Sequence, residues 1–288
     1  MLQLILFNLF NGLIIGAFYV LVSLGLSMIL NLSNVINFAH GNFLALGGYL
    51  AYALIPFIGF WPSLLVAPLA TALIGYVIEV TMISRLYGRD PIYSLLLTFG
   101  LAFMLQDACR YIWGVNGLPL SVPNNISQPL SQTYFFLNAY RLFLVGIVVV
   151  SVLGLFAFLR YSRMGMRIRA GILDLDTVSA LGINVRMLRS LNFAFGIFLA
   201  GLAGVLAGGQ IGLNPNMGDT LLLPSFVAII VGGMGSLVGT LLGGLTIGVA
   251  AALTAVVWPA GSDVVVYIIM AVVLLVRPRG FLGEEGMQ

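Results

Sequence analysis

Long apolar runs dominate this sequence, and their length limits the folds that the chain can adopt. An α-helix rises about 1.5 Å per residue, so roughly 20 apolar residues cross the hydrocarbon core of a bilayer, which is about 30 Å thick. Only 7% of the residues are charged, whereas a soluble domain contains about 25%. The sequence therefore predicts an all-α, polytopic integral membrane protein. Seven runs reach the required length, at residues 3–30, 42–60, 63–83, 92–113, 142–159, 191–213 and 236–257.

Two further apolar runs are short. Residues 221–232 give about a dozen residues before a glycine cluster, and residues 264–276 give about 13 before an arginine. The first run is too short to cross as a straight helix, which predicts a broken or re-entrant element. The second run can cross the membrane if its helix also includes the residues just before it. We therefore expect about eight transmembrane helices in a single domain, residues 1–288, with breaks near 31–41 and 221–235.

All twelve basic residues are arginines, and their positions predict the orientation of the chain. Ten of them fall in the loop 84–91, in the loop 160–190 or after the last apolar run, and the order of the spans places these segments on one side. Only Arg110 and Arg141 fall on the other side. Because cytoplasmic loops carry an excess of basic residues, we expect both loops and the C-terminus in the cytoplasm. Residues 114–140 and the N-terminus are expected outside.

A polar interruption lies between the first two predicted spans and contains four asparagines and the only histidine. Polar amides at this depth are costly unless neighbours, a cavity or a ligand satisfy them. We expect Asn37 to cap a helix that starts near His40 inside the membrane and points its positive dipole end into a transport pathway. An ordinary interfacial loop fits the pattern equally well. The residues assigned to a pathway here are Asn31, Asn34, Asn37, His40 and Gly41.

A glycine-rich interruption follows the short run, which we expect Pro224 to open. Glycine permits backbone turns that other residues do not tolerate. Both interruptions precede a helix with a Leu-Gly-Gly sequence, at 46–48 and 242–244, and such paired breaks are typical of a repeat with a shared site at the membrane midplane. We therefore add Gly233, Gly235 and Ser236 to the pathway.

The loop 160–190 is predicted to contain a short amphipathic helix. Asp174 or Asp176 can cap this helix, and Gly182 suits the position after its last turn. A short capped helix flanked by arginines suits docking on a soluble partner. The alternative is an interfacial helix that lies on anionic lipid.

Several classes of protein are excluded by residues that the chain lacks. Without lysine there is no P-loop and no nucleotide hydrolysis by that mechanism, and one histidine with one cysteine gives no nucleophile–base pair, disulfide or multi-cysteine metal site. A net charge of +3 is too small to indicate nucleic acid. The few ionisable residues in the spans include Asp107 and Arg110, which can pair on one helix face. None forms the relay that proton-driven transport usually needs.

Five segments, spread in order over nearly the whole chain, resemble the permeases of branched-chain amino acid ABC transporters, of the LivH type. They are Asn37–Gly41 (NFAHG), Arg160–Gly165 (RYSRMG), Ala180–Asn184 (ALGIN), Leu202–Leu206 (LAGVL) and Gly232–Ser236 (GGMGS).

The resemblance implies a non-enzymatic permease subunit of the bacterial inner membrane that imports amino acids, most specifically Leu, Ile and Val. It implies a second permease of the LivM type, two cytoplasmic ATPases that bind ATP and Mg²⁺, and an extracytoplasmic substrate-binding protein. The chain itself would bind no cofactor or metal and, besides these proteins, would contact only membrane lipid. Alternatives are an importer for urea, short amides or aromatic acids, and a stand-alone channel for a small polar solute. The resemblance also makes residues 171–184 the coupling helix, and the expected coupling residues are Arg163, Gly165, Arg169, Asp174, Asp176, Ala180, Leu181 and Gly182.

Overall fold

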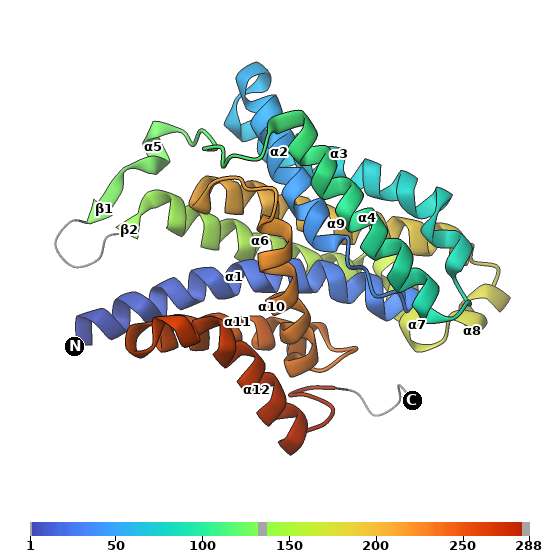
Figure 1. Ribbon diagram of the computed structural model, residues 1–288. Coiled ribbons are helices and arrows are strands. Elements are labelled where there is room, and N and C mark those ends of the chain that lie inside the picture. Colours follow the sequence, from blue (N-terminus) through green and yellow to red (C-terminus); the bar gives the residue numbers. More distant parts are fainter. Residues whose placement is uncertain (1, 132–136, 284–288) are drawn as a thin grey trace.

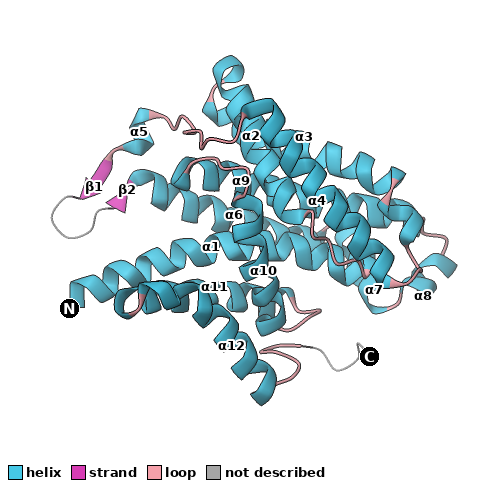
Figure 2. Cartoon of the chain, in the orientation of Figure 1, coloured by secondary structure: helices cyan, strands magenta, loops and turns pink. Residues whose placement is uncertain are grey.

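Eight helices in the described part of the chain, residues 2–131 and 137–283, are long and apolar enough to cross a membrane. The computed structural model thus confirms an all-α, polytopic chain (Figures 1 and 2). The last span reaches 18 residues because a 3-10 turn, Pro259–Gly261, precedes its helix. The eight helices are α1 (Leu2–Ser33), α2 (His40–Ile58), α3 (Phe60–Thr81), α4 (Pro91–Trp113), α6 (Ala139–Tyr161), α9 (Val185–Ile211), α11 (Leu237–Val257) and α12 (Ser262–Val276).

Shorter elements connect these helices. Between α4 and α6, two short strands pair antiparallel, and residues 132–136 of the expected loop 114–140 lie outside the described residues. The shorter elements are a 3-10 turn (Ile83–Leu86), α5 (Asn124–Ser127), β1 (Pro129–Ser131), β2 (Leu137–Asn138), α7 (Arg163–Leu173), α8 (Leu175–Ala180) and α10 (Met217–Gly232).

The interior of the bundle is built around α1, which packs against α9, α10 and α11. In Figure 1, α1 passes between α11 and α12 on one side and the group of α2, α3, α4 and α9 on the other. Small residues make close helix contacts: a methyl group on Gly204 would overlap the carbonyl oxygen of Leu44, and one on Gly248 would overlap the backbone of Gly16. Such contacts let backbones approach where lipid provides no hydrophobic drive between helices.

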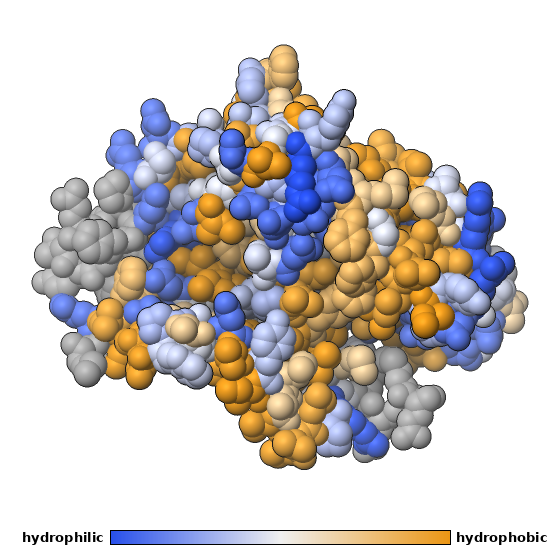
Figure 3. Space-filling view, in the orientation of Figure 1, coloured by the Kyte–Doolittle hydropathy of each residue, from blue (hydrophilic) through white to orange (hydrophobic). Residues whose placement is uncertain are grey.

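The starts of α9 and α11 lie at the same end of the bundle as the end of α1. The Asn192 amide donates to the carbonyl oxygen of Met28 at 2.8 Å, and the Thr240 hydroxyl lies 3.5 Å from that of Ser27. Figure 3 shows polar side chains over α7 and α8 and apolar surface on α12. We call the end of the bundle with α7 and α8 the arginine-rich end; it comprises residues 84–91, 160–190, 233–236 and 277–283.

The expectation that Pro224 opens the short helix is wrong, because α10 begins at Met217 and Pro224 lies inside it. A turn starts the helix earlier: the side chain of Asn214 accepts a hydrogen bond from the N–H of Asn216 at 2.9 Å. Asp219 in the first turn is favourable beside the positive end of the helix dipole. Membrane helices tolerate an internal proline because neighbouring groups compensate for the lost backbone hydrogen bond. With 16 residues, α10 is still shorter than a full span.

Candidate functional site

The first break turns back into the bundle. α1 ends at Ser33, yet the imidazole Nε2 of His40 lies 3.2 Å from the carbonyl oxygen of Val22. Val22 lies about three turns, or about 16 Å, before the end of α1. α2 therefore begins well inside the bundle, as expected of a half-helix.

Asn37 and His40 in this break are fully buried, whereas Asn34 is exposed. The prediction that Asn37 caps α2 is wrong, because the N-cap is Ala39 and no side chain caps this helix. Asn37 Oδ1 accepts a hydrogen bond from the N–H of Ala39 at 3.1 Å, since an asparagine readily closes a turn with the amide two residues later. Asn34 has a left-handed φ of 51°, which asparagine tolerates better than most residues.

The first turns of α2 and α10 lie against each other. A methyl group on Gly41 would overlap the carbonyl group of Gly218, and the reverse is also true. The positive dipole ends of two helices are thus adjacent. Asn31, also assigned to the pathway, lies elsewhere on α1, where its amide donates to the Ser27 hydroxyl at 3.2 Å.

The second break stays at the arginine-rich end. Gly233 and Gly235 have left-handed φ values of 102° and 94°, and the Ser236 hydroxyl caps α11 by accepting from the N–H of Gly239 at 3.0 Å. The backbone N–H groups of residues 281–282 donate to carbonyls at the end of α10. The two breaks therefore do not share a site. Instead, α10 connects them, with its start at the first break and its end at the second.

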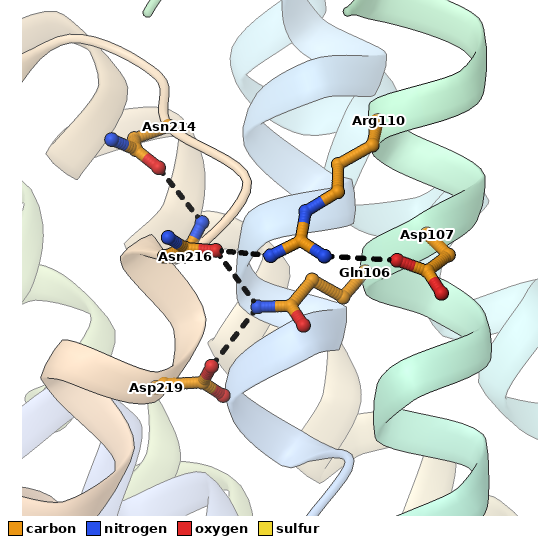
Figure 4. Close-up of polar contacts among 6 residues, drawn as sticks. All are labelled: Gln106, Asp107, Arg110, Asn214, Asn216 and Asp219. Carbon is orange, nitrogen blue, oxygen red and sulfur yellow. Dashed lines mark hydrogen bonds and ion pairs between the residues drawn. The ribbon is translucent and has the colours of Figure 1, made fainter. Parts of the chain in front are cut away.

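A polar cluster joins the C-terminal end of α4 to the start of α10 (Figure 4). Gln106 Nε2 donates to the side chains of Asn216 and Asp219, both at 3.0 Å, and Arg110 donates to Asn216 at 2.7 Å. Arg110 also forms the expected ion pair with Asp107 at 3.0 Å. The sequence reasoning missed Gln106, Asn216 and Asp219. The available signal was an aspartate in the first turn of a helix that follows an Asn-Pro-Asn turn.

Two cavities flank one ridge of α10. Asp219 and Leu223, one helical turn apart, line both of them. The larger cavity has a volume of about 690 Å³ and is also lined by Asn8, Asn11, Phe18, Tyr19, Arg141, Gln210, Thr220, Asp263 and Tyr267. The smaller cavity has a volume of about 180 Å³ and is also lined by Phe38, Asn42, Phe99, Ala102, Phe103, Gln106 and Leu222.

At the arginine-rich end, the predicted short helix is confirmed as α8, with Asp174 rather than Asp176 as its cap. The Asp174 carboxylate accepts from the N–H groups of Asp176 and Thr177, both at 3.0 Å. The Thr177 hydroxyl also donates to Asp174, and these hydrogen bonds hold the pKa of the Asp174 carboxyl below its usual value. Gly182, with a φ of 79°, follows the last turn as expected.

A second helix in this loop, α7, was not expected. Ser162 caps it by accepting from the N–H of Gly165 at 2.8 Å, and Gly165 lies so close to the end of α6 that a side chain there would overlap the Phe158 carbonyl oxygen. α7 and α8 together present Leu173 and Leu181 to the surface, 79% and 74% exposed. Leu181 is one of the expected coupling residues, and those that are also exposed are Arg163, Arg169, Asp174, Asp176, Ala180 and Gly182, whereas Gly165 is buried.

A family model described as "Branched-chain amino acid transport system / permease component" matches residues 8–274. The chain belongs to this family. It is 34% identical to the high-affinity branched-chain amino acid transport system permease protein BraD of Pseudomonas aeruginosa, over 98% of this chain and 96% of BraD. It is 31% identical to the corresponding permease protein LivH of Escherichia coli, over the same shares of the two chains.

Two more distant likenesses extend the comparison. The permease protein LivM of Escherichia coli is 29% identical over 76% of this chain and 57% of LivM. A chain of PsaBC from Streptococcus pneumoniae, in complex with Fab, matches this chain with a TM-score of 0.50 at 14% identity. The match spans 92% of this chain and 89% of the PsaBC chain, and it shows a shared fold. As a member of the family, the chain is a multi-pass transport permease.

Proposed function

We propose that this chain is a permease subunit of an ATP-binding-cassette importer that carries branched-chain amino acids across the bacterial inner membrane into the cytoplasm. The observation that carries the proposal is the 34% identity along 96% of a relative named for this transport. The alignment spans the breaks, α10 and the loop with α7 and α8, since it extends over 98% of the chain.

The solute pathway, in this proposal, passes the junction of α2 and α10. Asn37, His40 and Gly41 lie where α2 begins inside the bundle, and a helix start in a membrane favours polar or anionic groups through its dipole. The residues of the second break lie at the arginine-rich end, where they would form part of the inner mouth. In the proposed orientation the arginine-rich end, with the C-terminus, faces the cytoplasm.

The partners in this proposal are a second permease of the LivM type, two cytoplasmic ATPases that bind ATP and Mg²⁺, and an extracytoplasmic substrate-binding protein. The likeness to LivM over 76% of this chain supports a pair of related permeases. The exposed α8, capped by Asp174 and flanked by α7, would seat in an ATPase so that closure of the ATPases rocks the membrane helices. ATP hydrolysis would then belong to the partners.

The coupling role is tested by Leu181→Glu in the complete importer, reconstituted in vesicles. Leu181 is 74% exposed, so the charge disturbs a docking surface and not the interior. We expect ATP-driven leucine uptake to fall at least tenfold while the two permeases still assemble. Leu181→Met is the matched control and should retain uptake. Uptake at the wild-type rate in the glutamate variant would contradict the coupling role, and passive leucine flux through the purified chain alone would favour a channel instead.

A further inference from the structure

We propose that Asp219 binds the α-ammonium group of a zwitterionic amino acid as the solute passes between the larger and the smaller cavity, with Leu223 against its aliphatic side chain. This inference rests on the proposed function and names the chemistry of its pathway. Asp219 and Leu223 are the residues that line both cavities, and they place a carboxylate and an apolar group one helical turn apart. An amino acid with a branched aliphatic side chain presents the complementary pair of groups.

The charges of the larger cavity support this assignment. Its lining includes one guanidinium, Arg141, and two carboxylates, Asp219 and Asp263. Among residues 2–131 and 137–283 the ion pair found is Arg110–Asp107, so these three charges are not paired with one another. Arg141 donates to the Asn11 amide at 2.8 Å. A cavity that holds unpaired charges of both signs suits a solute that also carries both, and its excess of carboxylates favours the ammonium group.

Asp219 is held in place but keeps the capacity to accept further hydrogen bonds. Its Oδ2 accepts from Gln106 Nε2 at 3.0 Å, which fixes the carboxylate against α4. A carboxylate can accept about four hydrogen bonds, so an ammonium group can bind the same side chain without displacing Gln106. An ammonium–carboxylate contact of this kind is stronger than a neutral hydrogen bond.

The smaller cavity contributes a second polar group. Asn42 lines this cavity and is 2% exposed, and its Oδ1 has no hydrogen-bond partner in the described part of the chain. A buried amide without its full set of partners is costly unless something satisfies it. The rest of the wall is mostly aromatic, with Phe38, Phe99 and Phe103. This combination suits a solute with one polar end and one apolar end.

The assignment distinguishes amino acids from uncharged solutes such as urea and short amides. These have no ammonium group, so they can donate only neutral N–H hydrogen bonds to the carboxylate, which are weaker than an ammonium–carboxylate contact. If Asp219 selects for charge, the permease itself contributes to specificity beyond that of the binding protein.

The first test compares Asp219→Asn with Asp107→Asn in the complete reconstituted importer. Asparagine keeps the shape and still accepts from Gln106, but it loses the charge. We expect leucine uptake to fall at least tenfold in Asp219→Asn, with partial recovery in Asp219→Glu. Asp107 lines neither cavity, and Asp107→Asn should transport within twofold of the wild type. Wild-type uptake in Asp219→Asn would overturn the proposal.

The second test needs no transport, so it separates this inference from the proposed function. Leu223→Cys in a Cys109→Ala background of the full complex is labelled with a water-soluble thiol reagent, and the labelling rate is measured with three probes. We expect leucine and leucinamide, which carry the ammonium group, to slow labelling, and 4-methylpentanoate, which lacks it, to have no effect. Adding Asp219→Asn should abolish the protection. Equal protection by 4-methylpentanoate, or protection that survives Asp219→Asn, would overturn the role of Asp219 even if the importer carries leucine.

Discussion

The two interruptions of the helical bundle show two different ways to break a helix in a membrane. The first, before α2, uses the buried side chain of Asn37 to satisfy a backbone N–H, and it reaches deep into the bundle. The second, before α11, uses the backbone freedom of Gly233 and Gly235 at the arginine-rich end. In the membrane interior each unsatisfied backbone group costs several kcal/mol. A deep break therefore needs a side chain that makes the hydrogen bond water would otherwise make. The glycine turn instead depends on another segment, because the backbone N–H groups of residues 281–282 donate to the carbonyls beside it.

The largest effect is expected from Gly41→Val, which breaks the contact between the first break and α10. Even a single methyl group at Gly41 would overlap the backbone carbonyl of Gly218, and the position of a Cβ is fixed by its own backbone, so neither group can rotate away. Overpacking of this kind costs about 1–3 kcal/mol or more, and we expect about 3 kcal/mol. The measurement is titration of the purified permease pair with a denaturing detergent.

The control for Gly41→Val is Gly100→Val. Gly100 lies on α4, and a methyl group there would meet nothing within 4 Å. We expect this variant to unfold at the wild-type detergent concentration. Equal stability of the two variants would show that the contact between the starts of α2 and α10 does not hold the first break in place.

The second prediction concerns Asn37→Ala, which removes the side chain on which the first break depends. The N–H of Ala39 loses its acceptor in a fully buried position, and a buried donor without a partner costs about 1–3 kcal/mol. We expect a loss of about 2 kcal/mol in the same titration. Asn34→Gly is the control, because Asn34 is exposed and its φ of 51° suits glycine. If Asn37→Ala is as stable as the control, a side-chain amide is not what allows the first break to lie deep.

Much of this fold could be predicted from the sequence because membrane spans follow from length and apolar content alone. The same local logic predicted α8, since a capping aspartate and a following glycine mark the ends of a short helix. The junction of α2 and α10 could not be predicted. It depends on Gly41 and Gly218 meeting across a long sequence separation, and a single glycine in a glycine-rich chain gives no periodic signal.

Two errors share a cause. Pro224 suggested the start of a helix, but α10 begins at Met217 and continues through it. Asp219 was overlooked because it lies before the expected helix start. Once α10 begins at Met217, Asp219 becomes a first-turn residue beside two cavities. The error in the boundary thus hid the residue on which the solute-binding inference depends.

The third prediction tests the glycine break with Gly233→Ala. Alanine at a φ of 102° is strained, and its methyl group would lie 2.7 Å from both the Arg279 carbonyl oxygen and the Gly283 Cα. Backbone strain of this kind costs of order 1–3 kcal/mol, and we expect between 1 and about 2 kcal/mol. Gly88→Ala is the matched control, since Gly88 has a φ of 77° and open space around it. Equal losses in both variants would mean that strain alone acts and that the C-terminal segment does not cover the turn.

The smallest effect is expected from Ser236→Ala, which removes the cap of α11 and leaves the glycine turn intact. The Gly239 N–H loses its bond of 3.0 Å to the Ser236 hydroxyl, and loss of such a cap costs about 1 kcal/mol. Ser236 is only partly buried at the bundle end, so water can replace part of the lost bond, unlike at Asn37. Ser236→Asp restores a capping oxygen and should recover stability. A larger loss of stability in Ser236→Ala than in Asn37→Ala, in the detergent titration, would contradict this comparison. It would mean that the depth of a break in the bundle does not determine how strongly its stability depends on side-chain hydrogen bonds.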